Sequence, residues 1–211
     1  MKTRSYVRTL VLLLVTVLGI GVLAGAYIVT TGVSARPQPS ALEAITARTV
    51  RGIAIRTRVR GVSNPIPASA DVIAEGRDHF ADHCAVCHGN DGSGNTEMGR
   101  GLFPRAPDMR LPATQNLSDA ELFYIIENGV RLTGMPGWAT GTKEGETSSW
   151  HLVHFIRHLP ALTDEDIEHM ELLNPKSPEE IRQEIEAEKF LQGGDVTPTE
   201  PPTHEHSGAH Q

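Results

Sequence analysis

Residues 83–89 read HCAVCHG, and they contain Cys84 and Cys87, the only two cysteines in a chain of 211 residues. His88 follows the second cysteine directly. Two cysteines this close occur in four kinds of site: a structural disulfide, a redox-active dithiol, half of a zinc site, and a point of covalent haem attachment. The residues on either side of this stretch help to distinguish among the four.

A zinc site and a redox dithiol both fit the chain poorly. Structural zinc takes four protein ligands, commonly from two cysteine pairs, and this chain has one pair. His79, His83 and His88 could complete the set, but His88 adjoins Cys87 and the usual separated histidine pair is missing. A thioredoxin-like dithiol is expected beside a strand–helix–strand unit. Here the cysteines end a predicted helix and open onto a glycine-rich loop.

Haem attachment explains more of the pattern. Cys-x-x-Cys-His is typical of c-type haem attachment, in which two thioethers fix the porphyrin edge and the adjacent histidine ligates the iron. Met135, in the stretch GMPGW (134–138), is a candidate sixth ligand in a loop between two predicted helices. A thioether is a soft ligand that suits low-spin iron and raises its potential. Met98 and Met109, which follow His88 more closely, are weaker alternatives.

Three helices are predicted around these residues. A capping box at Ser118 and Glu121, in which each side chain satisfies a free backbone amide, marks the start of the middle helix. Apolar residues at helical spacing indicate the first helix, which runs into Cys84, and Pro160 ends the last. The predicted helices cover residues 69–84, 121–128 and 149–159. The Gly- and Pro-rich stretches between them, 89–116 and 131–148, are expected to be irregular.

From Asp71 to Leu159 the chain resembles a class I cytochrome c. A first helix with a glycine and an aromatic residue (Gly76, Phe80) precedes the Cys-x-x-Cys-His motif. A proline-rich loop, a short helix, a Met-Pro loop and a last helix with aromatics (Trp150, Phe155) then follow in that order. The resemblance covers under half of the chain, but its motifs are specific.

The resemblance implies an all-α protein, with a small class I cytochrome c helical fold wrapped around one covalently bound haem c. The residues implied to bind this haem are Cys84, Cys87, His88 and Met135, the last two on the iron. The first and last helices are expected to cross at the glycine. A proline carbonyl of the first loop should accept a hydrogen bond from the other nitrogen of the histidine. Pro104 and Pro107 are both candidates for that carbonyl.

An apolar N-terminal segment predicts a membrane anchor. Thr9–Thr30 carries no charge, and as a helix it would be about 33 Å long, enough to cross a hydrocarbon core of ~30 Å. A cleaved signal peptide has an apolar region of only about 7–15 residues, although Val33-Ser34-Ala35 resembles a cleavage site. Lys2, Arg4 and Arg8 favour a cytoplasmic N-terminus, but arginines also follow the span, so charge alone is ambiguous. The resemblance places the haem domain on the periplasmic side, where c-type haems are attached.

Composition and charge divide the chain into segments. We predict a cytoplasmic N-terminus (1–8), a transmembrane signal-anchor (9–30), a basic Pro-bracketed linker (31–69), a cytochrome c domain (70–160), an acidic helical extension (161–192) and a disordered His-containing tail (193–211). The linker makes a poor amphipathic helix because arginines and isoleucines mix on its helical wheel. It is either a solvated coil or an arginine-rich strip on anionic lipid headgroups. His151, His154 and His158 share one face of the last helix, and a solvated stripe is expected there.

Electron transfer is the expected function, because an iron with both axial positions filled has no open site for a substrate. We expect a single-pass, membrane-tethered electron carrier, not an enzyme, that meets redox protein partners at the cell membrane. Neither nucleic acid nor a small-molecule substrate is expected as a partner. Two alternatives stay open: a haem sensor from which Met135 dissociates, and a cytochrome subunit of a larger redox complex.

Overall fold

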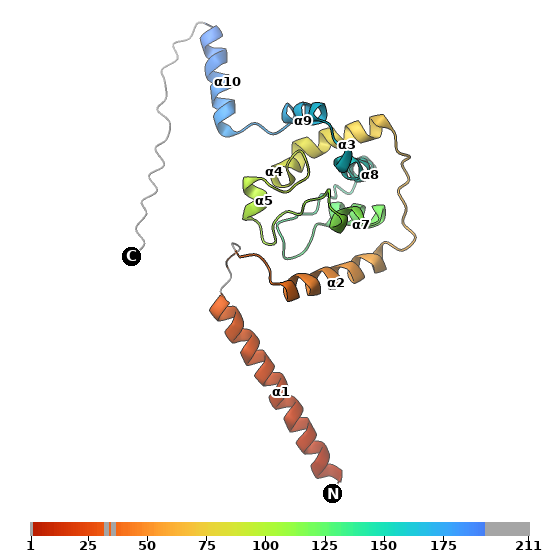
Figure 1. The fold of residues 1–211 in the computed structure, drawn as a ribbon, viewed down its shortest axis with the longest axis vertical. Coiled ribbons are helices and arrows are strands. Elements are labelled where there is room, and N and C mark those ends of the chain that lie inside the picture. Colours follow the sequence, from red (N-terminus) through yellow and green to blue (C-terminus); the bar gives the residue numbers. More distant parts are fainter. Residues whose placement is uncertain (1, 32–33, 35–36, 193–211) are drawn as a thin grey trace, which may run out of the picture. The chain divides into compact units, whose positions relative to one another are not determined.

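A computed structural model describes residues 2–31, 34 and 37–192 of the chain, and these residues form helices and loops without a β-strand (Figure 1). The expected all-α fold is confirmed. The helices are α1 (Lys2–Thr31), α2 (Ala41–Arg58), α3 (Ala70–His83), α4 (Ala85–His88), α5 (Glu97–Gly101), α6 (Pro112–Gln115), α7 (Asp119–Asn128), α8 (Lys143–His158), the 3-10 turn η1 (Leu159–Ala161), α9 (Asp164–Glu171) and α10 (Pro178–Leu191). The predicted disordered tail, 193–211, lies outside the described residues.

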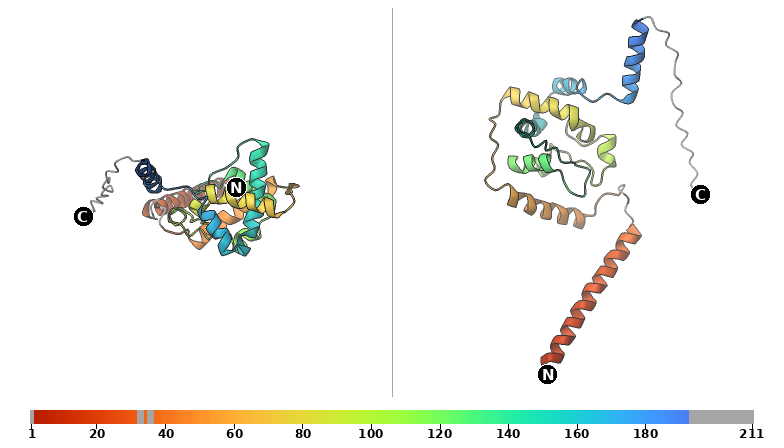
Figure 2. Two further views of the ribbon diagram at one scale, coloured as in Figure 1. Left: turned by 90° about the horizontal axis from the view of Figure 1, so that it is seen from above. Right: turned by 180° about the vertical axis from the view of Figure 1, so that it is seen from behind.

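The centre of the domain is the crossing of α3 and α8, which Figure 2 shows from two further sides. The backbones touch at Gly76, where an added Cβ would lie 2.3 Å from the carbonyl oxygen of His151. Phe80 and Phe155 pack their rings beside this point with centroids 5.1 Å apart, and both are almost fully buried. The predicted crossing at the glycine is therefore confirmed.

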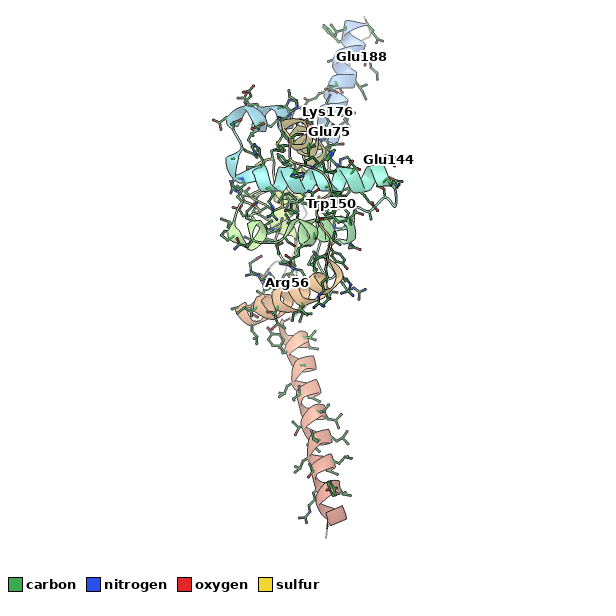
Figure 3. The ribbon with its side chains drawn as sticks, turned by 90° about the vertical axis from the view of Figure 1, so that its right-hand side faces the viewer. Arg56, Glu75, Glu144, Trp150, Lys176 and Glu188 are labelled. Carbon is green, nitrogen blue, oxygen red and sulfur yellow. The ribbon has the colours of Figure 1, made fainter. Side chains whose placement is uncertain are left out.

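Helix α7 packs against α8 and completes the core. Its predicted capping box forms, since Ser118 accepts from the amide of Glu121 and the Glu121 carboxylate accepts from the amide of Ser118. Phe123 stacks on Trp150 with ring centroids 4.0 Å apart, and Figure 3 shows Trp150 on the α7 side of α8. These contacts hold α7 against α8, and the loop of Met135 follows the C-terminal end of α7.

Two predicted boundaries were wrong. The first irregular stretch contains two short helices. Helix α5 follows Thr96, whose side chain accepts a hydrogen bond from the amide of Gly99, and α6 begins at Pro112. Helix α8 begins at Lys143 and not at 149, because the side chain of Thr142 caps the amide of Gly145. Glutamates in the first turn stabilise α8 further, because their negative charges lie at the positive end of the helix dipole.

The predicted linker is not a coil throughout. Its middle forms α2, capped by the hydroxyl of Ser40, which accepts from the amide of Glu43. The side chain of Ile55 is 6% exposed, and Arg56 forms an ion pair with Glu121. A helical wheel could not reveal this arrangement, since the contact with α7 selects which face of α2 is covered (Figure 1).

The acidic extension contains two helices, α9 and α10. Its first helix, α9, packs against α3, with Met170 fully buried and Arg77 Nη1 3.0 Å from Asp166 Oδ1. The chain divides into two compact units after Leu173, and α10 belongs to the second unit. Capping boxes at Thr163 and Ser177 begin α9 and α10.

His151, His154 and His158 on α8 are half-buried and the first two form polar contacts, so the expectation of a solvated stripe was wrong. His151 Nδ1 lies 2.8 Å from Glu75 Oε2 on α3. His154 Nε2 lies 2.8 Å from the carbonyl oxygen of Ile66, in the segment between α2 and α3. These contacts tie both the segment and α3 to α8.

Helix α1 contains an apolar stretch, Tyr6–Thr30, of 25 residues with a mean hydropathy of 2.5 and no burial against other described residues. By length and composition it can cross a membrane. This is weak evidence for a single-pass anchor, because an N-terminal signal sequence has the same features.

Candidate functional site

The Cys-x-x-Cys-His motif forms one helical turn at the end of α3. The amide of Cys84 still donates to the carbonyl of Phe80 at 2.8 Å, and the amide of His88 donates to the carbonyl of Cys84 at 3.0 Å. Consecutive short turns therefore place both thiols and the imidazole within one compact segment. The two cysteines are not joined in a disulfide.

Burial raises the pKa of Cys84 to about 12, with a further contribution from Cys87, and burial also raises the pKa of Cys87. A redox-active dithiol needs the opposite effect, because the thiolate is the reactive species. The thiol environment therefore disfavours the dithiol alternative.

Thr96 holds the turn that carries the cysteines. No sequence motif marks this residue as functional. Its hydroxyl lies 2.8 Å from the carbonyl oxygen of Val86 and 3.2 Å from that of Cys87. Gly99 packs so closely that an added Cβ would be 2.2 Å from the Cys87 carbonyl oxygen. The start of α5 thus covers the carbonyl end of α4.

His88 is largely buried, and its Nδ1 is a buried polar atom that lacks a partner at full hydrogen-bonding geometry. Burial lowers its pKa, and the carbonyl of Pro107, the backbone acceptor on this imidazole, partly opposes the shift. Of the two prolines that the sequence left open, the structure therefore selects Pro107. Gly94, at φ +71°, donates to the His88 carbonyl at 2.7 Å, and an added Cβ would be 2.4 Å from the Ala106 carbonyl oxygen.

Met135 lies in the loop 130–139, which we call the Met135 loop, and backbone hydrogen bonds attach this loop to the end of α7. The amide of Trp138 donates to Ile126 at 3.0 Å, and the carbonyl of Met135 accepts from Val130 at 3.1 Å. Gly129, at φ +66°, leaves room for the turn, since an added Cβ would be 2.6 Å from the Met135 carbonyl oxygen. The half-buried Met135 is therefore held on a defined loop.

The Met135 loop reaches both sides of the cysteine motif. The ring of Trp138 stands edge-on to His83, the residue before Cys84, with centroids 5.7 Å apart. Gly134 packs against the side chain of Leu102, in the first loop, so closely that an added Cβ would be 2.5 Å from it. Sequence reasoning placed Trp138 only in the ligand stretch and missed Leu102.

The other methionines have different environments. Met98 is 53% exposed on α5, and exposure disfavours it as a ligand inside a haem pocket. Met109 is buried in the hydrophobic core, and its amide donates to the carbonyl of Gly92. Met170 is buried beneath α9. Each buried methionine therefore fills space in the core, as the flexible thioether side chain commonly does.

The residues of this site fit a haem c. The imidazole of half-buried His88 has the Pro107 carbonyl as its backbone acceptor, and a ligating histidine usually has such a partner on the ring nitrogen that does not bind the metal. Cysteine thiols and a methionine thioether supply the remaining donor chemistry. Across the part of the chain that the structure describes, no three His, Cys, Asp or Glu side chains converge on a possible metal position. The zinc alternative lacks the ligand set that it requires.

Comparison with known proteins agrees with this geometry. The family described as "Cytochrome C oxidase, cbb3-type, subunit III" matches residues 71–156, which include α3, the cysteine motif, the Met135 loop and most of α8. No curated protein matches the chain. The helical fold, the crossing at Gly76 and the family match lead to one conclusion: residues 71–156 are a class I c-type cytochrome domain, the domain of an electron-transfer haem protein.

Proposed function

We propose that this chain is a membrane-tethered c-type cytochrome with one haem, which carries single electrons between respiratory or oxidoreductase partners on the periplasmic face of the cytoplasmic membrane. His88 carries the proposal, because its imidazole follows both cysteines in one turn, has a buried Nδ1, and has the Pro107 carbonyl as its backbone acceptor. A histidine with only a structural role in the core would not require two adjacent thiols, a glycine-lined loop and a methionine-bearing loop around it.

Covalent attachment is assigned to Cys84 and Cys87. These two thiols would hold the haem by adding to its two vinyl groups, each forming one C–S bond while the thiol proton passes to carbon. The addition needs no external oxidant or reductant. Thr96 supports the step by fixing the carbonyl groups of the α4 turn, and thereby the spacing of the two sulfur atoms.

Axial ligation is assigned to His88 and Met135. When bound, the haem supplies a one-electron Fe(III)/Fe(II) couple. The Pro107 carbonyl orients the imidazole and increases its basicity, while the bonds from the Met135 loop to α7 hold the thioether. With both residues on the iron, no position would remain for a substrate, and we therefore infer an electron carrier.

The anchor is assigned to α1, in line with its apolar stretch Tyr6–Thr30. Lys2, Arg4 and Arg8 at its start favour a cytoplasmic N-terminus, so that the cytochrome domain lies on the other side. A haem attached outside the cytoplasmic membrane requires the same orientation.

A second candidate is a cytochrome subunit held permanently in a redox complex. The description of the matching family names an oxidase subunit, and this observation favours it. Helix α10 adds support, because it leaves Ile181, Ile185 and Phe190 substantially exposed within the second compact unit. Affinity isolation after gentle detergent extraction distinguishes the candidates: a carrier elutes alone, and a subunit elutes with stoichiometric partners.

The proposal is tested on the holoprotein with two measurements. After denaturing electrophoresis the haem should stay on the polypeptide, and acidified organic solvent should not extract it. Carbon monoxide should leave the visible spectrum of the reduced native protein unchanged. Haem that is fully extracted would refute the thioether assignment, and carbon monoxide binding by the native protein would favour the sensor alternative.

A further inference from the structure

Helix α2 is joined to the cytochrome domain by specific contacts. The guanidinium Nε of Arg56 lies 3.1 Å from Glu121 Oε1, and Ile55 is 6% exposed. Burial disfavours the charged form of Glu121, but hydrogen bonds from Ser118 and Arg56 outweigh it and lower its pKa below the usual range. Figure 3 labels Arg56 on α2, the helix beside α7. Whatever binds α2 therefore also orients the domain.

One face of α2 carries exposed apolar side chains. Leu42, Ile45, Thr49 and Ile53 recur at intervals of three and four residues, so they line one side of the helix. Leu42 is 76% exposed, and Ile45 and Ile53 are 62% and 61% exposed. Val50 lies next to this row and is 61% exposed. A row of this kind on a charged helix indicates an interaction surface.

Other sides of α2 carry exposed arginines. Arg48, Arg58 and Arg60 are exposed on or directly after α2, and Glu43 is the helix's one acidic residue. An amphipathic helix with arginines beside an apolar face binds a bilayer surface by burying the apolar side chains among the headgroups. Each arginine near an anionic surface adds about 1 kcal/mol of attraction. The charge of α2 therefore matches anionic lipid.

The position of α2 in the chain also favours lipid over a protein partner. Residues 32–40 join α1 to α2, and a stretch of this length extends at most about 32 Å. If α1 spans the bilayer, the start of α2 cannot leave the vicinity of the membrane surface. The tether keeps the local concentration of lipid around α2 high, and a soluble protein partner would have to compete with that lipid for the same face.

We propose that α2 lies on the membrane surface, with Leu42, Ile45, Val50 and Ile53 inserted among anionic headgroups, and so holds the cytochrome domain in one orientation on the bilayer. This inference rests on the proposed anchoring by α1. In this arrangement the domain does not swing on a flexible linker. Its α7 side faces the lipid, because α2 contacts α7 through Ile55 and Arg56.

Photocrosslinking of the full-length holoprotein tests the inference. The protein is placed in nanodiscs of phosphatidylcholine and phosphatidylglycerol that carry a diazirine high in the acyl chain, and crosslinked peptides are identified by mass spectrometry. Peptides of α1 and α2 should be labelled. Peptides of α10 should remain unlabelled although Phe190 and Leu191 are exposed, which controls for exposed apolar side chains in general.

The double variant Ile45→Glu/Ile53→Glu should reduce α2 labelling about tenfold, with α1 labelling and the haem spectrum unchanged. Leu191→Glu is the matched control and should change neither. The inference is overturned if α1 is labelled but α2 is labelled no more than α10. It is also overturned if the double variant does not reduce the labelling of α2. Unlabelled α1 with labelled α2 refutes the proposed anchor alone, and absence of both labels refutes both.

Discussion

At the scale of single residues, the site depends on places where backbone touches backbone. Gly94 and Gly99 admit carbonyl groups of the first loop and of Cys87, and Gly129 admits the Met135 loop. The sequence predicted the ligands because Cys-x-x-Cys-His and Met-Pro are local patterns. It could not select between Pro104 and Pro107, because the path of the whole loop determines which carbonyl faces His88.

Gly76→Ala tests the closest of these contacts outside the site. The new Cβ would lie 2.3 Å from the His151 carbonyl oxygen, so α3 and α8 must separate, and we expect a loss of about 1–3 kcal/mol in the free energy of unfolding. Denaturant titration of the holoprotein measures it. Gly101→Ala is the matched control, because no atom lies within 4 Å of its added Cβ, and it should be nearly neutral. Equal stability of the two variants would contradict the crossing.

At the scale of helices, capping signals made good predictions, whereas apolar spacing revealed α3 but not α2. The boxes at Ser118 and Thr163 are local and form as expected. Helix α2 was missed because its covered side is defined by a contact with Glu121, 65 residues away in the chain. Part of α8 was missed because the cap at Thr142 lies inside a Gly-rich stretch.

Ile55→Ala should loosen α2 from α7, because Ile55 is the side chain of α2 that is buried against the domain. A buried Ile→Ala change costs about 2 kcal/mol, which corresponds to roughly thirtyfold faster amide exchange in α2. Hydrogen–deuterium exchange of the detergent-solubilised holoprotein measures the effect. Ile53→Ala, on the exposed side of the same helix, should leave the exchange unchanged, and a similar acceleration in both variants would disprove the specific contact.

The docking of α9 should depend on pH through Asp166. Hydrogen bonds from Thr163, and then the ion pair with Arg77, lower the pKa of this carboxyl. Because the native pKa lies below the unfolded value of about 3.9, the stabilisation is complete above that value and is lost as the pH falls through the native pKa.

We therefore expect Asp166→Asn to lower the free energy of unfolding by about 1 kcal/mol at pH 7. Its stability should also fall less steeply than that of the wild type below about pH 4. Denaturant titrations across this range test both effects. Asp164→Asn, an exposed change in the same turn, should retain the wild-type slope. A slope for Asp166→Asn as steep as the wild type's would show that this carboxylate does not couple α9 to pH.

At the scale of the whole molecule, we propose that α1 as an anchor and α2 as a surface helix keep the haem domain at a membrane. Its electrostatic asymmetry agrees with this arrangement, since arginines gather before residue 61 and acidic residues after residue 162. Basic segments are drawn to anionic lipid and acidic ones are repelled from it. We therefore expect the acidic segment that follows residue 162 to be repelled from anionic lipid.

Removal of residues 1–35 behind a cleavable signal should release a folded, reducible haem domain into the soluble fraction and slow membrane electron flux. The flux falls because a tether keeps the local concentration of the carrier high, on the order of millimolar for short linkers. Oxygen or quinone turnover in isolated membranes measures it at native expression. Unimpaired flux, or a natural mature chain that begins at Arg36 in the soluble fraction, would make the anchor incidental.

The central claim is that His88 and Met135 together fill the axial positions of a covalently bound haem. Its most direct test is the absorption spectrum of the oxidised Met135→Ala holoprotein. We predict that the weak far-red sulfur-to-iron band disappears, that the reduced variant binds carbon monoxide, and that the potential falls. The variants Met98→Ala and Met109→Ala should keep the band. An unchanged spectrum in Met135→Ala would contradict the account.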